Sequence, residues 1–158
     1  MLAEGHDERL KDRSWTVADV DRPLRHALEV RHSTYENAGF IELLRKHDIA
    51  LVVADTAGKW PFLEDITSNF VYVRLHGAEE LYVSGYDDPA LEVWANKIRC
   101  WRSGHLPEGA RLAGAVTADG VERDVYVYFD NDVKVRAPFD AMSLATKVGL
   151  RAGGGGGR

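Results

Sequence analysis

The chain has 158 residues, of which 45% are hydrophobic and 28% are charged. These proportions match soluble globular domains and exclude a disordered, a collagen-like or a coiled-coil chain. Acidic side chains outnumber basic ones and give a net charge of −5. Because an acidic chain is a poor general phosphate binder, a broad basic nucleic-acid surface is not expected.

The sequence also limits the cellular compartment. Cys100 is the one cysteine, which excludes an internal disulfide and a multi-cysteine zinc site. No apolar run approaches the roughly 20 residues that cross a membrane. Residues 1–13 are charged and lack the apolar stretch of a signal peptide. We therefore expect a cytoplasmic protein without membrane contact.

The predicted elements begin with a strand over residues 25–32. Ser33 follows, and Glu36 comes three residues later. This is the spacing of a capping box, in which each side chain satisfies a backbone amide of the other, so a helix is predicted to start there. Residues 49–54 are a short continuous apolar run, which is typical of a parallel strand buried on both faces.

The second half of the chain continues this alternation. Residues 70–75 are rich in aromatic and β-branched side chains and predict a third strand. Asp88 and Pro89 are typical of a helix N-cap and a first helical residue, and an amphipathic helix follows them. Residues 124–129 predict a fourth strand, and a last helix is expected over about 138–148.

The order of elements is read as strand and helix repeated four times, which favours βαβ units, a parallel sheet and right-handed crossovers. Asp119-Gly120 is a turn signal that predicts a hairpin between residues 112–117 and 121–123. No P-loop or G-x-G-x-x-G motif occurs. The expected organisation is a polar lead-in over 1–23, a folded domain over 24–150 and a disordered glycine-rich tail over 151–158.

Polar side chains follow each predicted strand, and active sites of parallel α/β folds form at the carboxyl ends of strands. Carboxylates there can act as general acids, general bases or metal ligands, and histidines can act as ligands or proton carriers. Arginines can hold a phosphate or carboxylate group. The candidate catalytic residues are Glu29, His32, Asp55, His76 and Asn131, and the candidate substrate-binding residues are Arg31, Arg74 and Asp130.

These candidates also have structural interpretations. Glu29 lies inside a strand, where it could form a buried ion pair with Arg31 or Arg74. His32 and His76 could be ordinary hydrogen-bonded imidazoles, or could hold a divalent metal, although no local H-x-x-H or H-x-E spacing supports a metal site. The candidates that could simply cap or turn the chain are Asp55, Asp130 and Asn131.

Three segments in this order resemble the YecE-like family, also called domain of unknown function 72. They are ALEVRH at 27–32, TSNFVYVRLHG at 67–77 and VYVYFDND at 125–132. The resemblance covers about residues 22–150 and implies a TIM barrel, but the family has no firmly established activity. It also implies that one cavity is faced by Glu29, Arg31, His32, Asp55, Arg74, His76 and Asn131.

The sequence departs from the family's pattern in several places. The family's glycine-rich opening strand has no counterpart, and a full barrel takes about 250 residues. Asp130 and Asp140 stand where the family usually has Asn, and residues 104–121 resemble an insertion. We therefore expect an α/β fold that forms a parallel (βα)4 half of a TIM-type (β/α)8 barrel. Such a half exposes two strand edges, so a homodimer or a separate N-terminal half-barrel partner is expected.

The predicted function follows from the strand-end residues and the resemblance. It is a hydrolase or isomerase that acts on a small anionic substrate, either phosphorylated or sugar-like, and that is incomplete in this chain. A divalent metal is the one cofactor these residues suggest. Two alternatives stay open: a non-catalytic nucleic-acid-binding module, which the net charge disfavours, and an inactive truncated or split half-barrel that assembles with a partner.

Overall fold

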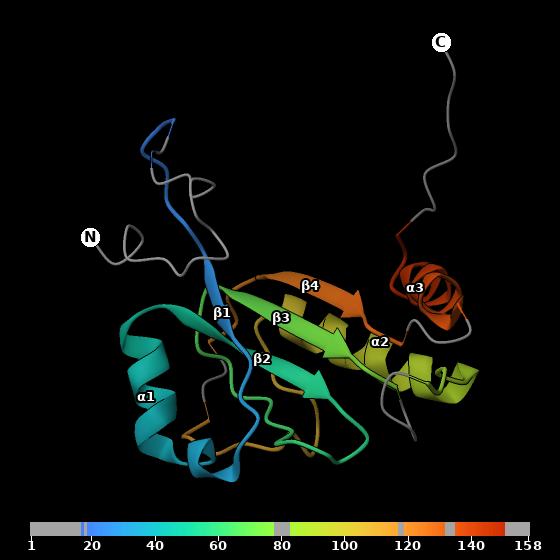
Figure 1. Ribbon diagram of the computed structural model, residues 1–158, viewed down its shortest axis with the longest axis horizontal. Helices are drawn as coiled ribbons and strands as arrows, with labels where there is room; N and C mark the ends of the chain where they lie inside the picture. The colour runs from blue at the N-terminus through green and yellow to red at the C-terminus, as the bar shows by residue number, and fades with distance from the viewer. Residues whose placement is uncertain (1–16, 18, 78–82, 117–118, 132–134, 151–158) are drawn as a thin grey trace, which may run out of the picture.

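The computed structural model describes residue 17 and residues 19–77, 83–116, 119–131 and 135–150. The expected α/β fold is confirmed: within these residues, four parallel strands form one sheet in the order β1-β2-β3-β4, with three helices (Figure 1). The strands are β1 (His26–Leu28), β2 (Ile49–Asp55), β3 (Phe70–Leu75) and β4 (Asp124–Phe129). The helices are α1 (Ala38–Lys46), α2 (Asp88–Arg102) and α3 (Arg136–Lys147).

One face of the sheet carries the larger hydrophobic core. Side chains of a strand point alternately to its two faces, and Val71, Val73 and Leu75 of β3 all point to the covered side. The apolar stripe of α2, which includes Trp94 and Trp101, packs against them. Figure 1 shows α2 behind β3 and β4, so this helix covers the back of the sheet.

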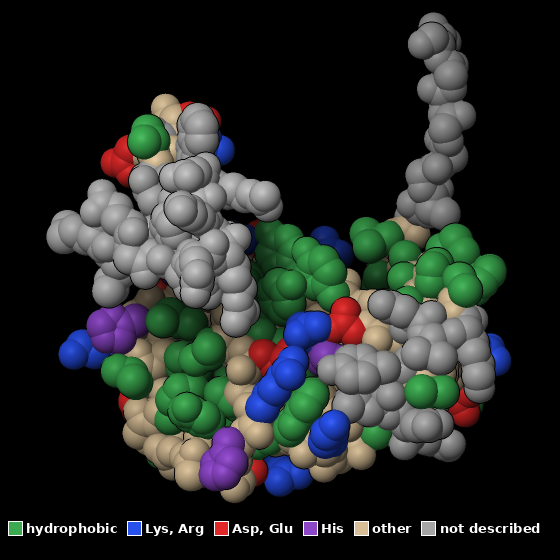
Figure 2. Space-filling view, in the orientation of Figure 1, with side chains coloured by type: hydrophobic (Ala, Val, Ile, Leu, Met, Phe, Trp, Pro, Cys, Tyr) green, Lys and Arg blue, Asp and Glu red, His purple; other side chains and the backbone are tan. Residues whose placement is uncertain are grey.

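The opposite face is concave and open. Tyr126 and Tyr128 of β4 remain 40% and 49% exposed there, and no described helix covers them. Arg25, just before β1, donates a hydrogen bond of 2.9 Å to Asp124 of β4. Because β1 and β4 are the two outer strands, this contact requires a strongly curled sheet. The curl encloses a pocket of about 540 Å³, and Figure 2 shows the hydrophobic patch over β3 and β4.

The first strand and first helix are shorter than the sequence predicts. β1 covers only His26–Leu28 of the predicted 25–32. The capping-box prediction is wrong, because Ser33–Tyr35 forms a separate 3-10 turn and Glu36 leaves helical geometry with φ −79° and ψ 64°. Asn37 caps α1 instead, and its side chain accepts a 2.9 Å hydrogen bond from the amide three residues later. The other two helices begin close to their expected positions. Asp87 is the N-cap of α2, which begins at Asp88, and α3 begins at Arg136.

The connection between β2 and β3 corrects the predicted alternation of strands and helices. Residues 56–69 contain no helix, so the described residues hold three helices and not four. This loop is held by its own buried polar side chains. Thr67 is the clearest case, because its hydroxyl accepts from the Leu51 amide and donates to the Ile49 carbonyl, both at 2.7 Å.

The predicted hairpin near Asp119 is also wrong for the residues described. None of residues 112–116 and 119–123 forms a strand. The buried Asp65 carboxylate accepts hydrogen bonds from the amides of Ala113 and Gly114, both at 2.8 Å. These two amides therefore bond to a side chain and not to the backbone of a neighbouring strand. The predicted tail over 151–158 and most of the lead-in lie outside the described residues. No described helix is long and apolar enough to cross a membrane.

We predict that the two hydrogen bonds of Thr67 stabilise β2. Thr67→Val keeps the side-chain shape but removes the partner of two buried backbone groups, so the free energy of unfolding should fall by about 2 to 4 kcal/mol. Thr67→Ser is the matched control, since it keeps the hydroxyl and loses one methyl group worth about 1 kcal/mol. Urea denaturation measures both variants, and equal losses would contradict this role.

Candidate functional site

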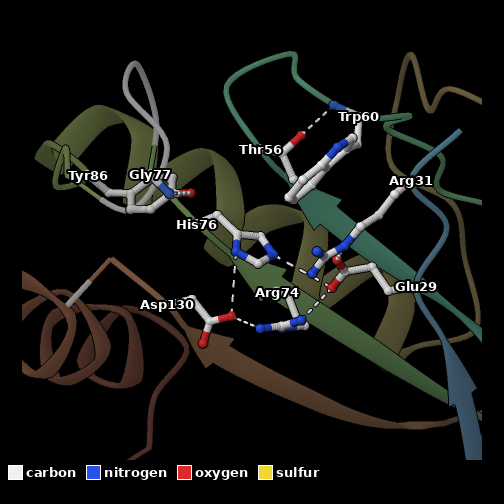
Figure 3. A network of polar contacts seen from close by, with 9 residues as sticks. All are labelled: Glu29, Arg31, Thr56, Trp60, Arg74, His76, Gly77, Tyr86 and Asp130. Carbon is white, nitrogen blue, oxygen red and sulfur yellow. Dashed lines mark hydrogen bonds and ion pairs between the residues drawn. The ribbon is translucent and has the colours of Figure 1, made fainter. Parts of the chain in front are cut away.

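An ion-pair network lies at the carboxyl edge of the sheet (Figure 3). Arg74, near the end of β3, donates from Nη1 to Glu29 Oε2 at 2.6 Å and from Nη2 to Asp130 Oδ2. Glu29 follows β1, and Asp130 follows β4. Arg74 therefore joins the two outer strands across the open face. Arg31 Nε donates to the other Glu29 oxygen at 2.9 Å.

His76 is fully buried against this network. Its Nε2 lies 3.6 Å from Glu29 Oε2, and its Nδ1 lies 3.5 Å from Asp130 Oδ2. The Trp60 ring stands edge-on to the imidazole, with centroids 6.2 Å apart. Burial and then the Arg74 cation lower the pKa of His76 below its ordinary value of 6.5, against the opposing effect of Glu29. The imidazole is therefore neutral at pH 7.

The carboxylate of Glu29 stays ionised. Burial alone would raise the pKa of Glu29, but hydrogen bonds from Arg31 and Arg74 outweigh burial and hold that pKa below its ordinary value. Arg74 faces two carboxylates, Glu29 and Asp130, which balance its positive charge. Arg74 is therefore a weaker binding group for an anionic substrate than an unpaired arginine would be.

Asp55 belongs to a second polar group, built around Tyr86. The Tyr86 hydroxyl donates to Asp55 Oδ2 at 3.0 Å and accepts the Gly77 amide at 3.1 Å. Burial raises the pKa of Asp55 despite the hydrogen bond from Tyr86. Burial also raises the pKa of the Tyr86 hydroxyl, followed by the effect of the Asp55 charge. The Asp55 carboxylate thus holds Tyr86 and not Arg74, while the Asp55 backbone carbonyl accepts the His76 amide at 2.9 Å.

Asn131 continues this second group and is fully buried. Its Nδ2 donates to Asp140 Oδ2 of α3 at 2.8 Å and to the Ser84 carbonyl at 3.2 Å. The same Asp140 oxygen accepts the Tyr86 amide at 3.1 Å. Asn131 therefore connects the end of β4 to α3 and to the segment before α2.

His32 has a different set of neighbours. Its Nδ1 accepts the Thr34 amide at 3.3 Å and lies 3.0 Å from the Thr34 hydroxyl, so the ring caps the 3-10 turn. No group of three or more His, Cys, Asp or Glu side chains within the described ranges has the arrangement of a metal site.

Five of the candidate residues meet at the carboxyl edge of the sheet, and two further residues that were not candidates shape the site. Trp60 lies in the loop after β2, and Tyr86 lies just before α2. Trp60 had a usable signal, since a large aromatic residue follows a strand that ends in polar residues. Tyr86 had none, because its partners are distant in the sequence. The five residues that the structure brings together are Glu29, Arg31, Arg74, His76 and Asp130.

Comparisons with known proteins agree with this fold. A DUF72 family protein of Thermotoga maritima MSB8, TM1631, superimposes with a TM-score of 0.59 and 23% identity, over 78% of this chain and 46% of that one. A DUF72 family protein of Enterococcus faecalis V583, EF0366, gives a TM-score of 0.61 and 16% identity, over 80% of this chain and 48% of that one. The chain thus spans about half the length of these solved relatives.

At the level of sequence, no curated protein matches the chain. Residues 5–155 match the family described as "Protein of unknown function DUF72". This match covers nearly the whole sequence and includes all three motif segments. The chain therefore belongs to the DUF72 family, the YecE-like family that its motifs resemble.

Proposed function

We propose that this domain is half of a TIM-type barrel and provides one wall of the active site of a hydrolase or isomerase. Its substrate is phosphorylated or sugar-like. Three observations support the half-barrel: the strands are all parallel, the sheet is curled, and the chain spans about half of its solved relatives. A second copy of this chain or a separate N-terminal half-barrel would supply the other half of the barrel and so complete the active site.

The observation that carries the proposed chemistry is the placement of His76. A neutral imidazole can accept a proton, and two carboxylates beside it can stabilise the imidazolium that results. Glu29 and Asp130 stand within 3.6 Å of the two ring nitrogens. Arg74 fixes both carboxylates from the opposite side. Buried titratable groups with specific charged partners are typical of functional sites.

The open face offers a surface for a sugar ring. The rings of Tyr72 and Tyr128 stack with centroids 5.0 Å apart and an interplanar angle of 16°. Both line the pocket of about 540 Å³, together with Glu29 and Arg74. Aromatic faces bind the apolar side of a ring, while phenol hydroxyls and charged groups orient its polar edge. A substrate on this face would reach the His76 network at the carboxyl end of the strands.

The nucleic-acid-binding alternative has less support. Phosphate contacts need cations that are free to replace counterions. Arg25 is paired with Asp124, and Arg74 faces two carboxylates. The other alternative is an inactive half-barrel. The following experiment distinguishes it from an enzyme, because an inactive half-barrel shows no turnover.

Turnover should depend on His76 and its carboxylate neighbour. The wild-type chain, at the mass given by light scattering, is tested with p-nitrophenyl phosphate and p-nitrophenyl glycosides for hydrolysis, and with aldose phosphates for isomerisation. Loss of a general acid or base lowers turnover by at least about 100-fold, which is expected for His76→Gln. Asp130→Asn changes a partly exposed side chain, so it tests the same site with less risk to folding.

The control for this experiment is His47→Gln, which removes an exposed histidine at the end of α1 and should keep full turnover. Circular dichroism confirms that each variant is folded. The proposal is wrong if the wild type turns over none of these substrates, or if both His76→Gln and Asp130→Asn keep full turnover.

The ionisation of His76 gives a second prediction. Its pKa in the folded chain lies below 6.5, so the unfolded chain binds more protons in the window between the two values. The stability from this group is therefore complete above pH 6.5 and is lost as the pH falls through the folded pKa. NMR titration of the ring carbon protons should show a midpoint below pH 6.5. A midpoint at or above that value would contradict the lowered pKa, and a midpoint above pH 7 would remove the neutral base from the mechanism.

A further inference from the structure

A second pocket lies beside the His76 network and shares Arg31 and Trp60 with its surroundings. Three segments meet around it: the 3-10 turn after β1, the loop after β2, and the segment that carries Arg111. Its volume is about 380 Å³. We call it the cationic pocket, and its lining includes Arg31, His32, Ser33, Lys59, Trp60 and Arg111.

The charge of this pocket is opposite to that of the chain. Three permanent cations line it, while Glu36 is the one carboxylate in its lining. The whole chain carries a net charge of −5. Lys59 forms no ion pair within the described part of the chain, and its Nζ lies 5.1 Å from the centroid of the Trp60 ring. Lys59 is therefore a cation whose charge is available to a ligand, unlike Arg74.

The buried residue Glu64 holds the backbone of Arg111 in place. Glu64 is fully buried, and its carboxylate accepts the Arg111 amide at 3.1 Å. The Glu64 amide in turn donates to the Arg111 carbonyl at 2.8 Å. Lys97 donates to the other Glu64 oxygen. This double contact fixes the backbone of Arg111 at the rim, where its guanidinium lies 3.3 Å from Glu36.

Lys59 is presented by a tight turn. The Lys59 amide donates to the Thr56 carbonyl at 3.1 Å, and the Thr56 hydroxyl accepts the Trp60 amide at 3.1 Å. Gly58 and Ala57 both have positive φ, +76° and +50°. Ala57 pays a steric cost in this conformation, which folded proteins keep mainly where surrounding contacts or function require it. The turn thus holds Lys59 and Trp60 in place.

The remaining lining groups supply further hydrogen-bond donors. The Arg31 guanidinium lies over the Trp60 ring, 4.2 Å from its centroid, and only its Nε is taken by Glu29. His32 Nδ1 accepts the Thr34 amide, so a neutral ring carries its proton on Nε2 and can donate there. Guanidinium, ammonium and imidazole donors together are the groups that bind phosphate oxygens.

We infer that the cationic pocket binds the phosphate group of a phosphorylated substrate whose reacting part lies at His76. This inference rests on the proposed function and narrows its substrate class to phosphate monoesters. Trp60 connects the two sites, because the cations of Arg31 and Lys59 lie near its ring and the same ring stands edge-on to the His76 imidazole. The two neighbouring sites then divide the work: one holds the phosphate, and the other moves a proton.

Phosphate binding tests this inference directly. Inorganic phosphate and phenyl phosphate are titrated into labelled protein, and the indole N–H resonance of Trp60 is followed by NMR. We expect saturable shifts for the wild type. Removal of a charged donor to phosphate should weaken binding by about tenfold or more in Lys59→Gln and in Arg111→Gln.

The controls separate this inference from the proposed function. Lys46→Gln removes an exposed lysine in the last turn of α1 and should bind phosphate as the wild type does. Asp130→Asn should keep phosphate binding even where it abolishes turnover. The inference is overturned if the wild type shows no saturable shift, or if Lys59→Gln and Arg111→Gln bind phosphate with unchanged affinity. Neither result depends on whether His76 supports turnover.

Discussion

The bridge that Arg74 forms between Glu29 and Asp130 is the interaction on which the site depends. It ties the residues after β1 and β4 to the middle of the sheet, so the two outer strands stay curled toward each other. Partly buried ion pairs of this kind gain little net stability, because desolvation offsets the attraction. Their value here is geometric, since the bridge holds two carboxylates against the ring of His76.

The same bridge divides the carboxyl edge into two electrostatic environments. Arg74 donates to both Glu29 and Asp130, so two carboxylates balance its charge beside His76. Beyond Trp60 the balance reverses, because Lys59 forms no ion pair within the described residues and Arg111 faces a single carboxylate. A neutral imidazole and the cationic pocket therefore lie next to each other in separate electrostatic environments.

Local patterns in the sequence predicted the sheet and the residues at its carboxyl edge. The strands are apolar and regular, and parallel strands bring their carboxyl ends to one edge, so Glu29, Arg74, His76 and Asp130 could be placed together. The loops could not be predicted in this way. Residues 56–69 and 110–114 are held by Glu64 and Asp65, whose bonds cross more than 45 positions of sequence. The hairpin was mispredicted because such long-range bonds are invisible to short-range signals. The capping box failed for a local reason, since Asn37 caps α1 in place of Ser33.

A double-mutant cycle between Arg74 and Glu29 tests the central claim most directly. Urea denaturation gives the free energy of unfolding for Arg74→Gln, Glu29→Gln, the double variant and the wild type. If the bridge fixes the site as described, the two substitutions should be coupled by about 1 kcal/mol or more. Additivity within about 0.3 kcal/mol would show that the two side chains act independently, and would contradict the account.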